Sequence, residues 1–227
     1  MMNRLYFDCT NGIAGDMVLN GLAALGVDDE MLKEKLTGVV PPDCEHCHED
    51  EHGHEHHHSH RSYEEIKGII ENAGLSKRAE GIALKIYETI ALAESKVHGT
   101  PLSETHFHEV GRSQAILNIL GVAICIDELG IEKVYASKVN DGKGTIICSH
   151  GEIPVPVPAV SEMMKVSDLS FGTLDVDTEL VTPTGLGILM GLDAADEVPD
   201  LENEDTVMVE VKGTRETGLD GLKIYLF

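Results

Sequence analysis

The stretch from Ser113 to Ile126 constrains the fold more than any other, because it contains no charged side chain. With Arg112 before it and Glu128 after it, the pattern predicts a helix over residues 112–128. A helix that is apolar on nearly all sides has to be covered by other elements on most of its faces. We therefore expect this helix to lie at the centre of the structure.

Strand-like runs and amphipathic helices alternate along the rest of the chain. A strand at Leu5–Phe7 precedes a helix over residues 16–25, and Ser62 with Glu65 predicts a capping box at a later helix start. Further helices are predicted over residues 29–36, 62–72, 76–98 and 159–165. Further strands are predicted over residues 133–135, 145–148, 206–211 and 222–226. This order predicts an α/β fold with a mixed sheet and helices packed against it, formed by one domain over residues 1–227.

Charge and cysteine content bound the cellular setting. The chain of 227 residues has a formal net charge of -23, which argues against a nucleic-acid or anionic-membrane surface and suits a protein that attracts cations. No run approaches the roughly 18 apolar residues that a membrane helix needs, and no signal peptide precedes the first strand. The five cysteines are odd in number and do not form a disulfide framework. We therefore expect a cytoplasmic protein with no membrane or nucleic-acid partner.

Residues 41–61 include the run from Cys44 to His60, whose composition no hydrophobic packing explains. This run contains eight of the twelve histidines, two of the five cysteines and five acidic residues. Imidazole nitrogen and thiolate sulfur are ligands of zinc, nickel, copper and cobalt, so we expect a mobile surface loop that captures and releases a divalent ion. A solvated low-complexity linker is the alternative. The metal ligands predicted in this loop are Cys44, His46, Cys47, His48, His52, His54, His56, His57, His58 and His60.

A glycine-bearing loop joins the first strand to the helix after it. Gly12 and Gly15 let the backbone approach a ligand and direct N–H groups from a helix start toward an anion. Asp8 and Asp16 flank this loop, where either carboxylate could hold a metal or a hydroxyl group. The alternative is a tight turn with Asp16 as a helix cap.

Three further histidines have neighbours that suit a folded site. His106, His108 and Glu109 place two imidazoles and a carboxylate within four residues. In an extended chain both imidazoles project to one face and form half of a metal site, while a buried, hydrogen-bonded pair is the alternative. His150 ends a predicted strand, and the alternating prolines over residues 154–158 predict a rigid segment that walls a pocket beside it.

The turn at Thr182, Thr184 and Gly185 leads from a predicted strand into a helix. Its two hydroxyl groups beside a helix start suit a phosphate or carboxylate, and N-capping of the helix is the alternative. With Gly12 and Gly15, these residues form the predicted site for an anionic ligand.

Six motifs occur in an order that resembles a known family. They are Tyr-Phe-Asp8-Cys-x-x-Gly12-Ile-Ala-Gly15-Asp16-Met17, the histidine-rich run, Val97-His98-Gly99, His106-Phe-His108-Glu109-Val-Gly111, His150-Gly151-x-x-Pro154-Val-Pro156-x-Pro158-Ala159 and Glu179-Leu-Val-Thr182-Pro183-Thr184-Gly185. Together they resemble the N-terminal part of the LarC family of nickel-insertion proteins. The resemblance implies insertion of nickel into pyridinium-3,5-bisthiocarboxylic acid mononucleotide, with formation of nickel–carbon and nickel–sulfur bonds and consumption of CTP.

Under this resemblance the loop collects nickel, and His106, His108 and Glu109 take it near the substrate. Forming a metal–carbon bond displaces a proton, which calls for a base within reach of the substrate. The candidate catalytic residues are Asp8, Asp16, Glu109 and His150.

The chain also departs from the family. Gln114 and Asn118 stand where the family has two aspartates, and neutral amides do not supply the charge that favours a divalent cation. The resemblance covers only the N-terminal part of the family, whose C-terminal domain is associated with CTP. We expect the chain to bind nickel, and zinc in vitro, and to need a C-terminal LarC-like partner domain for insertion. The alternatives are a non-enzymatic nickel or zinc storage or delivery protein and a structural subunit; an oligomer is compatible with each.

Overall fold

The computed structural model describes residues 3–41, 43, 61–107, 109–148 and 151–227. A five-stranded sheet runs in the order β10-β11-β1-β4-β9. Its strands are β1 (Arg4–Asp8), β4 (Lys133–Ala136), β9 (Ala195–Asp196), β10 (Val207–Val211) and β11 (Leu222–Leu226). Strand β1 is parallel to β4 and antiparallel to β11, so the predicted mixed sheet is confirmed.

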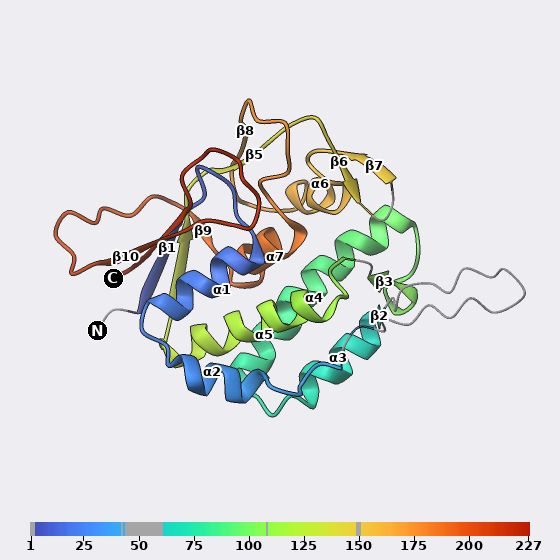
Figure 1. Cartoon of the computed structure of the whole chain (residues 1–227), viewed down its shortest axis with the longest axis horizontal. Helices are drawn as coiled ribbons and strands as arrows, with labels where there is room; N and C mark the ends of the chain where they lie inside the picture. Colours follow the sequence, from blue (N-terminus) through green and yellow to red (C-terminus); the bar gives the residue numbers. More distant parts are fainter. Residues whose placement is uncertain (1–2, 42, 44–60, 108, 149–150) are drawn as a thin grey trace, which may run out of the picture.

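The sheet presents two different faces, because side chains alternate along each strand. Leu5 and Phe7 of β1 point into the main core, whereas Tyr6 joins Tyr135 and Phe227 in a small aromatic cluster. Figure 1 shows the sheet at the left of the view and the helices in layers to its right. Helix α1 (Gly15–Ala24) packs on β10 and β11 and so forms the first of these layers.

The uncharged stretch forms helix α5 (Ser113–Glu128), which lies at the centre of the helical layers. It packs against α1, against α2 (Asp29–Leu36) and against the long helix α4 (Lys77–His98). Ten of its residues are buried, and these include an unbroken series from Asn118 to Ile126. The predicted central position is therefore confirmed.

Local capping explains where several helices begin. The Ser62 hydroxyl accepts from the Glu65 N–H and the Glu65 carboxylate accepts from the Ser62 N–H, which confirms the capping box of α3 (Tyr63–Glu71). Thr182 accepts from the Gly185 N–H at 3.1 Å and so caps α7 (Pro183–Gly191). Helix α6 (Pro158–Met164) begins with proline at a position that lacks an intrahelical N–H bond in any helix.

The remaining elements are short and were mostly not predicted. Three pairs of strands lie outside the main sheet, and a 3-10 helix, η1 (Leu102–Glu104), precedes β3. The pairs are β2 (Arg61–Ser62) with β3 (His106–Phe107), β5 (Val139–Asp141) with β8 (Phe171–Thr173), and β6 (Thr145–Cys148) with β7 (Gly151–Pro154). Among the described residues no helix is long and apolar enough to cross a membrane. The predicted histidine-rich loop falls outside the described residues.

Candidate functional site

A cavity of about 570 Å³ lies where several helix ends meet. The first turns of α1, α5 and α7 border it, together with the last turns of α4 and the β6–β7 hairpin. Its aliphatic wall includes Val97, Ala115, Ile146, Ile147, Ile153 and Val157. Its polar lining consists, in the described part of the chain, of Asp16, Glu94, His98, Glu109, Arg112, Gln114, Asn118, Cys148, Glu179, Thr182, Thr184 and Arg215.

The loop after β1 and the turn before α7 form one unit at this cavity. The Ile13 N–H donates to the Leu180 carbonyl at 2.9 Å, and the Thr182 N–H donates to the Ile13 carbonyl at 3.1 Å. Gly12 has a φ of 94°, and a Cβ at Gly12 or at Gly185 would overlap with the backbone of the other segment. These two glycines therefore serve the close packing of two motifs that are far apart in sequence.

A buried carboxylate outside the predicted site anchors the same turn. Asp141 Oδ1 accepts from the N–H groups of Gly142 at 2.7 Å, Leu180 at 2.8 Å and Val181 at 3.0 Å. Burial raises the pKa of Asp141, although these three donors act in the opposite direction. Charged acceptors form stronger hydrogen bonds than neutral ones, so Asp141 holds the chain in position as it enters Thr182.

An ion pair lies on the cavity wall between Glu179 and Arg215. The Arg215 guanidinium donates to the Glu179 carboxylate at 2.5 Å and to its backbone carbonyl at 3.1 Å. The Glu179 side chain is only 6% exposed, whereas that of Arg215 is 48% exposed. Burial raises the pKa of Glu179 against the influence of Arg215, and the nearby Asp141 and Glu109 carboxylates raise it further. Glu179 is thus a buried acid whose ionised form depends on one half-exposed cation.

The start of α5 supplies a neutral polar patch and a surface ion pair. Gln114 Nε2 donates to Asn118 Oδ1 at 2.9 Å, one turn along the helix. One hydrogen bond thus joins the two amides, whereas two carboxylates at these positions would repel. Glu109 lies in the turn before the helix and pairs with Arg112 at 3.1 Å.

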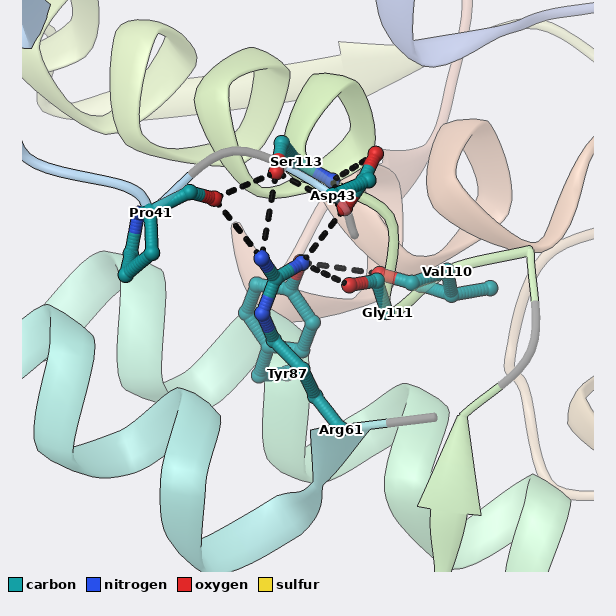
Figure 2. A network of polar contacts seen from close by, with 7 residues as sticks. All are labelled: Pro41, Asp43, Arg61, Tyr87, Val110, Gly111 and Ser113. Carbon is teal, nitrogen blue, oxygen red and sulfur yellow. Dashed lines mark hydrogen bonds and ion pairs between the residues drawn. The ribbon is translucent and has the colours of Figure 1, made fainter. Parts of the chain in front are cut away.

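Figure 2 shows the polar network beside the start of α5. The buried Arg61 guanidinium donates to the Asp43 carboxylate at 3.0 Å, to the Gly111 carbonyl at 2.6 Å and to the Pro41 carbonyl at 2.7 Å. The Tyr87 hydroxyl donates to a carbonyl of the same turn. These bonds join four separate stretches of the chain, around Pro41, Arg61, Tyr87 and Gly111.

Asp43 also caps α5 from a distance in the sequence. Its carboxylate accepts from the Ser113 N–H at 3.0 Å and from the Ser113 hydroxyl at 2.8 Å. Burial acts to raise the pKa of Asp43, but the bonds from Ser113 and Arg61 outweigh it and lower that pKa from its ordinary value. Asp43 and Arg61 flank residues 44–60 in the sequence. These two flanking residues therefore meet at a helix that borders the cavity.

The cavity gathers some of the predicted site residues and not others. Gly15, Asp16, Glu109, Thr182 and Thr184 line it. Asp8 instead accepts from the Thr10 N–H within its own loop, and His106 is exposed on β3 opposite Ser62. Neither of them belongs to the lining, and neither do Gly12 and Gly185. His108, His150 and the predicted ligands from Cys44 to His60 lie outside the described residues.

Among the described residues, six charged or ionisable members of the lining were not predicted site residues, and Arg112 and Cys148 are two of them. Glu94 and His98 come from the last two turns of α4, and Glu179 and Arg215 form the buried ion pair. The motifs Val97-His98-Gly99 and Glu179-Leu-Val-Thr182 contained a signal for two of them. Arg215 carries no such signal, because only the packing of a distant loop brings it to Glu179.

Comparison with known proteins agrees with the motifs. The family described as "Nickel insertion protein" matches residues 5–217. A relative from Acetivibrio thermocellus, named pyridinium-3,5-bisthiocarboxylic acid mononucleotide nickel insertion protein, is 41% identical over 213 residues, which cover 83% of this chain and 51% of the relative. Relatives of the same name from Clostridium kluyveri and Alkaliphilus metalliredigens are 42% and 35% identical, over 83% and 88% of this chain and 53% and 54% of their own length.

The matches differ in how much of this chain and how much of each relative they cover. The chain spans about half the length of the curated relatives it matches. No solved structure matches it. The family match nonetheless covers nearly the whole chain, from β1 to the loop that carries Arg215. On this basis the chain belongs to the nickel insertion protein family.

Proposed function

We propose that this chain is the nickel-handling and substrate-binding part of a protein that inserts nickel into pyridinium-3,5-bisthiocarboxylic acid mononucleotide. The observation that carries the proposal is the cavity, where residues from five of the family motifs meet in a chain that belongs to this family. Nickel is the cargo of the reaction, and CTP is expected to enter through a partner domain.

The shape and charge of the cavity suit the parts of such a substrate. The N-terminal ends of α1, α5 and α7 carry partial positive charge and favour an anion such as a phosphate. Thr182 and Thr184 add hydroxyl groups at this end, and Arg215 adds a positive charge. The aliphatic wall offers a surface for a flat ring. The substrate therefore places its phosphate toward α7 and its ring toward the β6–β7 hairpin.

The acidic residues of the cavity fit the handling of a cation. Four carboxylates and two guanidinium groups stand among the described lining residues, so an incoming dication is favoured. In this proposal the histidine-rich run collects the ion. Asp16 and Glu109, which line the cavity, then receive the ion there. A base has to accept the proton that nickel displaces from the substrate carbon. Among the described carboxylates of the lining, Asp16, Glu109 and the buried Glu179 are our candidates for that base.

A reconstitution experiment tests the function. The purified chain is incubated with nickel, the mononucleotide and CTP, with and without the separately produced C-terminal half of a relative. Two quantities are measured: the absorbance of the nickel product, and the activity that this product restores to a racemase lacking its nickel cofactor. We expect the chain alone to bind nickel without forming product, and we expect product once the other half is added. Replacement of Gln114 and Asn118 by Asp should raise the yield if the two amides limit turnover.

The outcomes separate the alternatives. Nickel binding without product in every combination would contradict insertion and favour storage or delivery. Efficient turnover by the chain alone would show that no partner half is needed. Product formation only in the presence of both halves would support the proposal.

A further inference from the structure

Helix α4 brings its C-terminal end to the cavity. The helix runs from Lys77 to His98 and stops at Gly99, which has a φ of 67°. The C-terminal end of a helix carries partial negative charge and favours a cation, within about one turn of its end. Helices α1, α5, α6 and α7 meet the cavity through their positive N-terminal ends. The cavity is therefore polarised, with α4 at its cation-favouring end.

Glu94 and His98 lie one turn apart at this end, and both line the cavity. His98 Nε2 and Glu94 Oε2 are 3.5 Å apart, and the side chains are 33% and 16% exposed. An imidazole nitrogen and a carboxylate oxygen are both ligands of nickel(II). Four residues of separation on a helix puts them on one face, where both can reach the same ion.

An ordinary surface ion pair does not account for this arrangement. Such pairs contribute little to stability, because water screens both charges. Glu94 is instead largely buried, and burial raises the pKa of Glu94 against the influence of His98. Burying a carboxylate is unfavourable unless a partner compensates it, and a cation held between Glu94 and His98 would do so.

The number of ligands also matters. No group of three or more His, Cys, Asp or Glu side chains is arranged to hold an ion within the part of the chain that the structure describes. Catalytic metal sites keep a coordination position open to admit a substrate, and a pair of protein ligands leaves more than one position open. A cargo ion has to leave again, so an open site suits it better than a closed one.

We propose that Glu94 and His98 hold nickel(II) at the α4 end of the cavity, with open coordination positions, before the ion passes to the substrate. This inference rests on the proposed function and names the site within it. In the transfer, the nickel–nitrogen and nickel–oxygen bonds to the protein break as nickel–sulfur bonds to the substrate form. The ion remains nickel(II), so the exchange needs no oxidant or reductant.

The test uses a variant of the 227-residue chain in which the ten predicted ligands from Cys44 to His60 are replaced by Ser. We call this variant the run-substituted chain, and we titrate it with nickel. Calorimetry with nickel chloride gives the affinity and stoichiometry, and the visible absorption of bound nickel reports its ligands. We expect one nickel ion per chain. His98→Ala should weaken its binding by about 10–100-fold, with a change in the absorption, and Glu94→Gln by about tenfold.

Glu88→Gln is the matched control for Glu94→Gln, because Glu88 is exposed on α4 outside the cavity lining and should leave the affinity unchanged. Thermal unfolding of each variant verifies that it is folded. Unchanged nickel affinity in a folded His98→Ala variant would overturn the proposal, as would an equal loss in Glu88→Gln. The titration needs no substrate, so nickel binding at Glu94 and His98 without insertion would support the site and contradict the function.

Discussion

Arg61 Nη1 and Asp43 Oδ1 lie 3.0 Å apart, although the whole histidine-rich run separates the two residues in sequence. The pair brings together, beside α5, the two described residues that flank positions 44–60 (Figure 2). A chain extends by at most about 3.5 Å per residue, so none of the 17 residues between them can lie more than roughly 30 Å from this pair. The same limit holds for every metal ligand predicted among them.

Replacing Arg61 by Met should destabilise the protein strongly. The Arg61 side chain is only 10% exposed, and its loss removes the donor of the buried Gly111 carbonyl and the cation beside Asp43. We expect the free energy of unfolding in urea to fall by about 2–4 kcal/mol. Lys77→Met is the control, because Lys77 forms an exposed pair with Glu80 and should change the free energy by less than about 0.5 kcal/mol. Similar losses of unfolding free energy in both variants would show that the Arg61 network stabilises the protein no more than an exposed ion pair does.

The contribution of Asp43 should depend on acid pH. Its folded-state pKa is lowered, so its stabilisation is present above the unfolded-state pKa of about 3.9 and is lost as the pH falls through the folded-state value. The difference in unfolding free energy between wild type and Asp43→Asn should thus persist at about pH 5 and shrink as the pH falls below about 3.9. Chemical denaturation across this range measures it. A difference that stays constant would show that the Asp43 charge is not involved.

The Arg215→Met variant should be destabilised more at high pH than at low pH. It leaves Glu179 buried without its cation, and the folded-state pKa of Glu179 is already raised by burial. An acid with a raised pKa imposes its full cost once the pH passes that value, and the cost disappears when it is protonated. We expect a loss of about 1–3 kcal/mol at pH 8 and a smaller loss at about pH 5, measured by urea unfolding. Adding Glu179→Gln to Arg215→Met should remove this pH dependence.

Gly185→Ala should weaken the contact between the two glycine-bearing motifs. Its Cβ would overlap with the Ile13 carbonyl group, which is itself bonded to the Thr182 N–H and cannot move away freely. We expect a loss of about 2–3 kcal/mol in urea unfolding. Gly81→Ala is the matched control, because Gly81 is exposed in α4 with open space around it. That change should be neutral or stabilise the protein by up to about 1 kcal/mol, and equal losses would argue against the contact.

The histidine-rich run should bind more than one nickel ion per chain. Wild type and the run-substituted chain are compared by nickel titration at pH 7.5 and at about pH 5.5. Imidazoles with a pKa near 6.5 gain a proton below about pH 6 and no longer bind metal, so the additional equivalents should be lost there. Equal stoichiometry in the two chains at pH 7.5 would contradict the role of the run as a nickel reservoir.

Much of the local structure follows from short-range patterns in the sequence. The capping box of Ser62 and Glu65 predicts the start of α3, because its bonds join residues only three apart. The absence of charge between Ser113 and Ile126 predicts a buried central helix, since no other position would keep those side chains from water. The short strands β2, β3, β5 and β8 were not predicted, because two or three residues are too few for a period of two to be seen.

The sequence by itself therefore determined the elements, the central helix, the family and one side of the site. Only the tertiary structure decided which side chains share the cavity, because that depends on packing between distant elements. It leaves His106 outside the cavity and adds Glu94, His98, Glu179 and Arg215 to it. Glu179 and Arg215 are 36 residues apart in sequence, yet they meet because Asp141 holds the 180–181 backbone in place and a loop folds back over it. No local pattern encodes that meeting, since the hydrogen bonds that enforce it form only once the core has assembled.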